Sequence, residues 1–132
     1  MEEIKVGEYA RTEEGEIFKV IEEEVDFYNF QIKKLKPKEI FNPIVKHSSN
    51  IIDLIKDGDF ITLYEHGCPV LITNLWRNRE YNPKDHNIYE DIISIEINNN
   101  QIFENIKNDN NFKIYSIVTK EQFKNIEYKL DN

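Results

Sequence analysis

One stretch of the sequence combines side chains that often make binding contacts. Residues 76–87 read Trp-Arg-Asn-Arg-Glu-Tyr-Asn-Pro-Lys-Asp-His-Asn and include the only tryptophan of the chain. Guanidinium groups beside flat aromatic rings can hold a phosphate and stack on a nucleic-acid base, and the same residue types anchor protein interfaces. The residues that would bind a ligand in this way are Trp76, Arg77, Arg79 and Tyr81. The alternative is that Trp76 closes a β-structure while the arginines pair with nearby acids.

A second candidate surface is acidic and lies near the N-terminus. Residues 1–26 contain ten acidic and three basic residues, and the whole chain has a net charge of -8. A negative surface repels the phosphates of DNA and RNA, which argues against direct nucleic-acid binding, and it can attract a basic partner. The residues of this acidic face are Glu13, Glu14, Glu16, Glu22, Glu23 and Glu24. The simpler interpretation is a solvated face that keeps the protein soluble.

No pattern in the sequence supports catalysis or cofactor binding. His66 and Cys68 stand two residues apart in a predicted turn, but the recognised zinc spacings are missing. We interpret Cys68 as a half-buried residue that behaves as a small hydrophobe. Asp57-Gly58-Asp59 lacks the alternating ligands of a calcium loop and is interpreted as a turn. Phosphate-binding glycine loops and nucleophile motifs are missing too, so we predict a non-enzymatic protein without cofactor or metal.

Length and composition favour one cytoplasmic domain. The chain has 132 residues, enough to bury a substantial core, and we expect a single domain over residues 1–132. Its one cysteine cannot form an intramolecular disulfide. It has no apolar run of the ~20 residues that a membrane span needs, and its acidic start is unlike a signal peptide. We therefore expect a cytoplasmic protein without membrane contact, and the sequence leaves its oligomeric state open.

A short phrase that occurs twice predicts two β-hairpins. Gly7-Glu8-Tyr9 and Gly58-Asp59-Phe60 are each followed, a few residues later, by a second glycine and a new apolar run. This is the pattern of a strand, a tight turn and a returning strand. The hairpin strands expected from it span residues 8–12 and 16–24, and residues 59–64 and 68–75.

Local signals place two short helices and several turns between the strands. Ser48 or Ser49 can cap a short helix at residues 51–55. Residues 119–122, Thr-Lys-Glu-Gln, match the reciprocal capping pattern at a helix start, and Phe123 and Ile126 would form the inner face of that helix. The expected turns and loops are residues 13–15, the polar loop 76–87 and the asparagine turn 98–100, where positive φ is tolerated.

The remaining apolar runs predict further strands. Residues 25–32 are rich in aromatic and β-branched side chains, and residues 88–97 would place Ile93, Ile95 and Ile97 on one face. Residues 101–107 fit either a strand or a helix. The other expected strands are 44–46, 112–118 and 127–130. The predicted class is mainly β (α+β), a small SH3-like barrel or β-roll of antiparallel hairpins with one or two short helices.

Three phrases resemble small phage and prophage proteins of unknown function from low-GC Gram-positive bacteria. They are Val-Gly-Glu-Tyr-Ala-Arg-Thr at residues 6–12, the stretch from Ile44 to Ile55 with Asp57-Gly58-Asp59-Phe60, and Ile-Val-Thr-Lys-Glu-Gln-Phe at residues 117–123. The resemblance implies a small β-rich barrel with short helices, and it carries no catalytic residues across. The segment 76–87 departs from the compact pattern of that group.

The resemblance, the small size and the acidity together favour a phage accessory protein that binds and inhibits a host factor. Anti-CRISPR and other anti-defence proteins work in this way. The acidic face would mimic nucleic-acid phosphates and occupy a basic groove of a host defence effector that binds nucleic acid. Two alternatives stay open, a small-ligand or nucleic-acid binding barrel that uses Trp76 and its neighbours, and a structural phage component.

Overall fold

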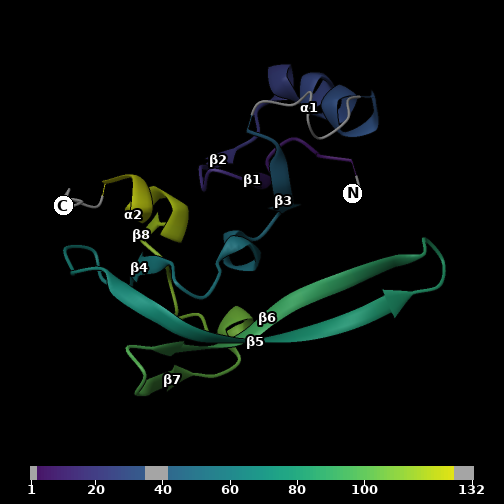
Figure 1. The fold of residues 1–132 in the computed structure, drawn as a ribbon. Helices are drawn as coiled ribbons and strands as arrows, with labels where there is room; N and C mark the ends of the chain where they lie inside the picture. Colours follow the sequence, from purple (N-terminus) through teal and green to yellow (C-terminus); the bar gives the residue numbers. More distant parts are fainter. Residues whose placement is uncertain (1–2, 35–41, 127–132) are drawn as a thin grey trace, which may run out of the picture. The chain divides into compact units, whose positions relative to one another are not determined.

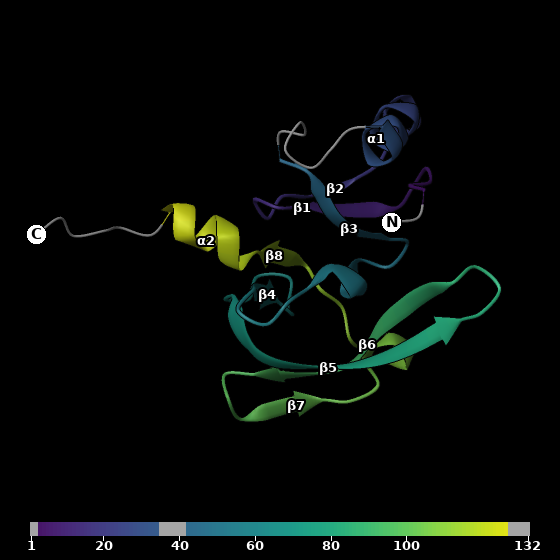
Figure 2. The same cartoon turned by 45° about the vertical axis from the view of Figure 1, so that its right-hand side comes forward.

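The chain is mainly β-structure and divides into two compact units. The computed structural model describes residues 3–34 and 42–126. Unit 1 comprises residues 1–54 and unit 2 residues 55–132, and each contains one antiparallel sheet. Figure 1 and Figure 2 show the elements of both units from two sides. The predicted mainly β class with short helices is confirmed.

Unit 1 is a three-stranded sheet with one helix packed against it. The strands are β1 (Tyr9–Thr12), β2 (Ile17–Lys19) and β3 (Ile44–Ser48), in the spatial order β2-β1-β3. The helix α1 spans Glu22–Lys34, and a one-turn 3-10 helix, η2, spans Ile51–Leu54. The predicted first hairpin is therefore confirmed, and its turn closes at Gly15, whose φ of +90° suits glycine.

The segment after β2 corrects the prediction of two strands at residues 16–24 and 25–32. Strand β2 ends at Lys19, and α1 begins at Glu22. Val25, Tyr28 and Ile32 recur at helical spacing and pack against the buried cluster of unit 1. That cluster consists of Ile4, Ala10 and Val20. The aromatic and β-branched composition suggested a strand, but burying one stripe at intervals of three and four residues requires a helix.

Strand β1 also carries a fully buried arginine. The guanidinium of Arg11 is inaccessible to solvent, and its Nη1 donates a hydrogen bond to the carbonyl oxygen of Leu54, at 2.9 Å. This bond ties β1 to the end of η2, 43 residues further along the chain. A buried charged donor with a fixed acceptor stabilises one arrangement of the two elements, because any other leaves the donor unsatisfied.

The short helix at residues 51–55 exists as η2, but its cap differs from the prediction. The backbone amide of Ile52 donates a hydrogen bond to Asn50 Oδ1, at 3.1 Å, rather than to a hydroxyl of Ser48 or Ser49. The Ser48 hydroxyl instead donates to Asp53 Oδ2, at 2.8 Å, and accepts the amide of Asn50. Asparagine is as good a cap as serine.

Unit 2 is a five-stranded sheet followed by a helix. Its strands are β4 (Phe60–Thr62), β5 (Val70–Asn82), β6 (Asn87–Ile97), β7 (Gln101–Phe103) and β8 (Ser116–Val118), in the order β7-β6-β5-β4-β8. A 3-10 helix, η3 (Ile106–Asn108), precedes β8, and α2 spans Lys120–Ile126. The predicted second hairpin is confirmed, with Phe60 opposite Leu71. Residues 101–107 hold both a strand and the start of η3, and the predicted strand 112–118 is shorter, beginning at Ser116.

Strands β5 and β6 form a long ribbon where the sequence predicted a polar loop at residues 76–87. The two strands pair from Ile72 opposite Ile97 to Asn82 opposite Asn87, so only residues 83–86 turn. The outer half of the ribbon extends beyond its pairing with β4 and β7, as Figure 1 and Figure 2 show. The residues of the outer half are mostly exposed, and strands without a buried face need no alternation of apolar residues, so the polar sequence of the ribbon resembles that of a loop.

A β-bulge changes the expected face of β6. Ile92, Ile95 and Ile97 are buried, whereas Ile93 is 43% exposed. Trp76 pairs with Ser94, but Arg77 pairs with Ile92. Ile93 therefore has no residue opposite it on β5. An extra residue of this kind exchanges the two faces of a strand. The prediction that Ile93 shares a face with Ile95 and Ile97 is therefore wrong.

The end of the described chain follows its local signals closely. Asn98 and Asn99 both have positive φ, as the predicted asparagine turn requires. At the start of α2, Thr119 Oγ1 accepts the amide of Gln122, at 3.2 Å, and Gln122 Oε1 accepts the amide of Thr119, at 3.1 Å. The reciprocal cap is thus confirmed. Ile126 is 73% exposed, which corrects its predicted place on an inner face, and the predicted strand 127–130 lies outside the described residues.

The repeated phrase forms the same turn in both units. In unit 1 the amide of Lys5 donates to Glu8 Oε1, at 2.7 Å, and in unit 2 the amide of Lys56 donates to Asp59 Oδ2, at 2.8 Å. The glycine before each acid has positive φ, +85° at Gly7 and +94° at Gly58. Each acidic side chain therefore fixes the backbone of a turn that leads directly into the first strand of its sheet.

Asp59 makes a further contact that joins the ends of unit 2. Its carboxylate is fully buried, and Oδ1 accepts the amide of Lys120 at the start of α2, at 2.9 Å. One side chain thus holds both the turn before β4 and the first turn of a helix 61 residues later. Carboxylates in this position also favour a helix N-terminus electrostatically.

Replacing Asp59 should destabilise unit 2 strongly. We expect Asp59→Ala to lower the free energy of unfolding by about 3 kcal/mol, because two backbone amides lose a buried, charged acceptor. Asp57→Ala is the matched control, since Asp57 is exposed in the same turn, and it should stay within about 0.5 kcal/mol of the parent. Urea denaturation followed by circular dichroism measures both. Equal effects of the two substitutions would contradict the role of Asp59.

Candidate functional site

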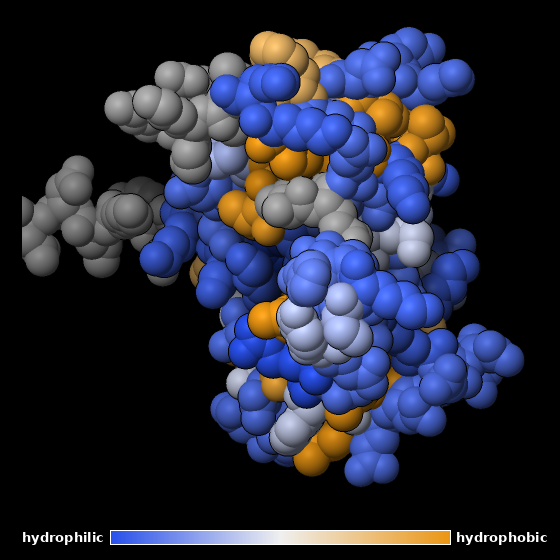
Figure 3. Space-filling view, turned by 90° about the vertical axis from the view of Figure 1, so that its right-hand side faces the viewer, coloured by the Kyte–Doolittle hydropathy of each residue, from blue (hydrophilic) through white to orange (hydrophobic). Residues whose placement is uncertain are grey.

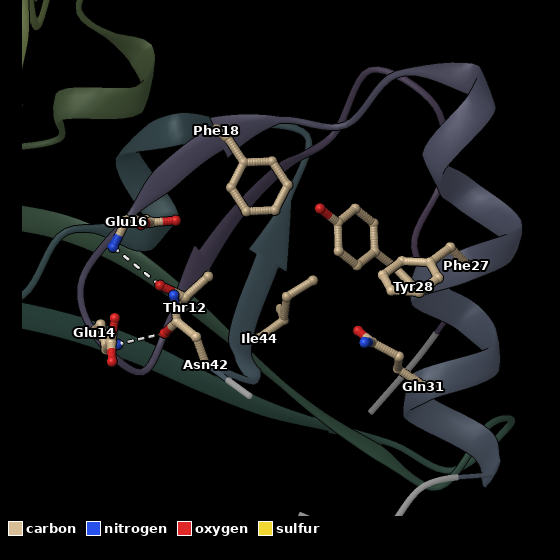
Figure 4. A pocket seen from close by; sticks show the side chains of 9 residues that line it. All are labelled: Thr12, Glu14, Glu16, Phe18, Phe27, Tyr28, Gln31, Asn42 and Ile44. Atoms are coloured by element: carbon tan, nitrogen blue, oxygen red, sulfur yellow. Dashed lines mark hydrogen bonds between the residues drawn. The ribbon is translucent and has the colours of Figure 1, made fainter. Parts of the chain in front are cut away.

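An open pocket of about 560 Å³ lies in unit 1 between the sheet and α1, as Figure 4 shows. A volume of this size falls within the usual range of ligand pockets. Strands β1, β2 and β3 supply one side and α1 the other. The lining residues are Thr12, Glu14, Glu16, Phe18, Phe27, Tyr28, Gln31, Asn42 and Ile44.

Three aromatic rings give the pocket its apolar surface. Phe18 of β2 and Tyr28 of α1 face each other with their ring centroids 5.5 Å apart, and Phe27 lies 5.4 Å from Tyr28 on the outer side. Phe27 is 58% exposed, so much of its ring is open to solvent. Figure 3 shows hydrophobic side chains at the surface in the upper part of the view, where α1 lies, among hydrophilic ones.

Two glutamates form the polar edge of the pocket. They lie on a turn whose backbone amides are hydrogen-bonded to neighbouring side chains. Thr12 Oγ1 accepts the amide of Glu16, at 3.0 Å, and Asn42 Oδ1 accepts the amide of Glu14, at 2.9 Å (Figure 4). Within residues 3–34 and 42–126, neither glutamate carboxylate takes part in a hydrogen bond or ion pair. Both carboxylates are exposed and thus available to a ligand on a backbone that is already ordered.

Tyr28 brings a neutral hydroxyl to the same pocket. Its phenol donates a hydrogen bond to Glu24 Oε2, at 3.2 Å. Burial of the ring raises the pKa of Tyr28 above its ordinary value, and the negative charges of Glu24 and Glu16 raise it further.

The structure divides the predicted acidic face into two groups. Glu14 and Glu16 line the pocket, and Glu13 is exposed in the same turn. Glu22, Glu23 and Glu24 form the first turn of α1, where acids stabilise the positive end of the helix. Glu24 Oε1 also accepts the amide of Ile21, at 3.4 Å, in the manner of a capping box. The three helix acids therefore have a structural explanation that the pocket pair lacks.

The second predicted cluster lies on strand β5 of unit 2 and is distributed over both faces of the ribbon. Successive side chains of a strand point to opposite sides, so Trp76 faces away from Arg77, Arg79 and Tyr81. Arg79 Nε forms an ion pair with Glu90 Oε1, at 2.7 Å, on the paired strand. The Tyr81 hydroxyl lies 2.8 Å from the Nδ1 atom of His86. Trp76 therefore does not share a face with the other three residues, and Arg79 and Tyr81 each have a partner on or beside the ribbon.

Cysteine and histidine residues form no further site in the described ranges. Cys68 is exposed, which corrects the interpretation of this residue as half-buried. Among residues 3–34 and 42–126, no group of three or more His, Cys, Asp or Glu side chains is arranged to hold a metal ion. None of the helices in these ranges has the length and apolar character needed to cross a membrane.

Comparison with known proteins gives no relative for this chain. No protein-family model, curated protein or solved structure matches it. The chemistry of the pocket is therefore the observation on which a function can rest.

Sequence reasoning missed the α1 side of the pocket. The sequence predicts a strand that contains Phe27, Tyr28 and Gln31, and a strand places neighbouring residues on opposite faces. Two sequence features indicate a helix here. Acidic residues at 22–24 and lysines at 33–34 suit the two ends of a helix, and Val25, Tyr28 and Ile32 recur at helical spacing.

Alkaline pH should reveal the environment of Tyr28. The folded state keeps the phenol proton to a higher pH than the unfolded state, so ionisation of Tyr28 lowers the free energy of unfolding as pH rises above about 10. We expect Tyr28→Phe to lose this part of the alkaline destabilisation. Urea denaturation of both proteins between pH 8 and 11 measures it, and identical pH dependence in the two proteins would contradict the assignment.

The acids at the start of α1 should stabilise the helix. We expect Glu22→Gln/Glu23→Gln to lower the free energy of unfolding by about 1 kcal/mol at low salt, because each acid is worth some tenths of a kcal/mol at a helix N-terminus. Glu65→Gln/Glu104→Gln, at two exposed positions in unit 2, makes the same change in net charge and is the control. Thermal denaturation at low salt and at 1 M NaCl measures the difference, which salt should remove. A loss equal to that of the control would refute this role.

Proposed function

We propose that this chain is a non-enzymatic binding protein that recognises a basic surface of a partner protein through the pocket side of unit 1. The observation that carries the proposal is the pairing of two unengaged carboxylates, Glu14 and Glu16, with the aromatic pocket formed by Phe18, Phe27 and Tyr28. Aromatic pockets supply most of the affinity at protein interfaces, and charges at their rim supply orientation and association rate.

Electrostatics support a basic partner over an acidic one. The chain has a net charge of -8, and the polar edge of the pocket is acidic. The electrostatic field of this negative charge attracts positively charged surfaces from beyond contact distance and repels nucleic-acid phosphates. The partner we propose is a host defence effector that binds nucleic acid, whose basic groove the acidic side would occupy as an inhibitor. The resemblance of residues 6–12, 44–60 and 117–123 to small phage proteins supports this choice, and a cytoplasmic location follows from it.

We further propose that unit 2 is an SH3-like barrel that serves as a scaffold. Its first four strands, β4 to β7, form a meander, and β8 returns to pair with β4 after the 3-10 helix η3. This strand order is that of SH3-like barrels. The described strands contain no ladder between β7 and β8, so the proposed barrel is an open one. SH3-like folds carry many unrelated functions, so the function is argued from the pocket of unit 1 alone.

Affinity capture with charge-reversed variants tests the proposed function. The tagged protein is incubated with a nuclease-treated lysate of a low-GC Gram-positive bacterium, and bound proteins are quantified by mass spectrometry. We expect one host protein to be recovered in stoichiometric amount, and at least tenfold less of it with Glu14→Lys/Glu16→Lys, since each lost interfacial contact of this kind costs about 1 kcal/mol or more.

A matched variant separates the pocket from net charge. Glu65→Lys/Glu104→Lys gives the same net charge from exposed positions in unit 2, and it should recover the partner as well as the parent does. Equal losses in both variants would show that only the overall charge matters. Equal recovery in all three proteins would refute the pocket side of unit 1 as the binding surface.

A further inference from the structure

We propose that the pocket of unit 1 is a receptor for a single arginine side chain presented by the partner. This inference rests on the proposed function and specifies the chemistry by which the partner is recognised. The pocket offers flat aromatic surface on one side and negative charge at its edge, with the side-chain amide of Gln31 at the end of the lining helix segment (Figure 4). Arginine is the one side chain that has a planar face and a permanent positive charge together.

The aromatic surface suits the face of a guanidinium. Phe18 and Tyr28 pack against each other, with their ring centroids 5.5 Å apart and their planes inclined by 38°, and together they form one aromatic side of the pocket. A guanidinium above such rings is attracted by their negative faces, with an interaction that strengthens as water is excluded. Phe27, more than half exposed, is placed to cover the methylene stem of an incoming side chain.

The carboxylates of the pocket suit the N–H edge of a guanidinium. Glu14 and Glu16 are two residues apart on a turn whose amides donate to the side chains of Asn42 and Thr12, so both acids belong to one ordered wall. A guanidinium presents five N–H donors in a fixed fork and can donate to two carboxylates at once. Lysine offers a point charge that is more strongly hydrated and has no face to stack, so it should bind more weakly.

The direction of the hydrogen bond made by Tyr28 is consistent with a cationic ligand. Its hydroxyl donates to Glu24, which leaves the phenol oxygen able to accept from an N–H group. The pocket thus presents acceptors from two elements, the phenol oxygen of Tyr28 on α1 and the carboxylates of Glu14 and Glu16 on the turn between β1 and β2. An anionic ligand would find no basic group among the lining residues.

Titration with arginine analogues, followed by amide NMR spectra of the whole chain, tests this inference. The probes are N-acetyl-arginine amide, N-acetyl-lysine amide and N-acetyl-citrulline amide, the last being neutral with nearly the shape of arginine. We expect saturable shifts at Phe18, Tyr28 and Gln31 with the arginine probe, and a dissociation constant of about a millimolar, as suits a ligand of this size. The lysine probe should bind several-fold more weakly, and the citrulline probe should give no saturable shift.

Two variants with a control assign the binding to the pocket. Glu14→Gln/Glu16→Gln should weaken the arginine probe at least tenfold, and Phe27→Ser about threefold, while Glu65→Gln/Glu104→Gln should leave it unchanged. All substituted side chains are exposed, so the variants should keep the dispersed spectrum of the folded protein. Equal binding of citrulline and arginine, or unchanged binding to Glu14→Gln/Glu16→Gln, would overturn the inference.

The arginine titration tests the arginine receptor and the capture experiment tests the proposed function, and either hypothesis can be refuted while the other stands. If the charge-reversed pocket loses the host protein but the arginine probe does not bind, the proposed function stands and the arginine receptor is overturned. If the arginine probe binds in the pocket and no host protein depends on Glu14 and Glu16, the receptor is supported and the proposed function is refuted.

Discussion

The structure depends on a turn that the chain uses twice, in which a carboxylate binds the backbone amide three residues before it. Glu8 does this ahead of the sheet of unit 1 and Asp59 ahead of the sheet of unit 2. In both, the amide of the preceding glycine donates to a carbonyl further along the chain, that of Val20 or Ile72. The buried carboxylate of Asp59, which satisfies two amides, is costly to replace, so this turn holds the start of the first strand of its sheet in place.

The pocket is a consequence of how unit 1 buries its small core. Helix α1 places Val25, Tyr28 and Ile32 against the sheet, which orients Phe27 and Gln31 along the adjoining edge. The turn between β1 and β2 comes to the same edge because β2 runs back along β1. The aromatic and acidic walls therefore come from two elements whose relative position is set by apolar packing, and they need no contact with each other to be aligned.

Much of the acidity of the chain has a local explanation, and the remainder is informative. The first turn of α1 uses three glutamates to stabilise a helix end, and Glu8 and Asp59 hold turns. The carboxylates of Glu14 and Glu16 serve no such internal purpose among the described residues. Exposed aromatic rings are unfavourable for solubility, and the free carboxylates beside them make no contact that stabilises the fold, which is the physical ground for assigning both to recognition.

Local sequence was enough to predict both hairpins, the asparagine turn and one of the two helix caps, because these depend on residues only a few positions apart. The cap at Thr119, the positive φ of Asn98 and Asn99, and both predicted hairpins follow from local hydrogen bonding. It predicted a strand in place of α1 and a loop in place of the β5 and β6 ribbon, since composition alone does not state which face of a segment will be buried. Only the tertiary structure brought Glu14 and Glu16 together with Phe27 and Tyr28. That meeting requires a helix to fold back over a sheet, and the packing of Ala10 and Val20 under α1 is a contact between segments that local sequence does not specify.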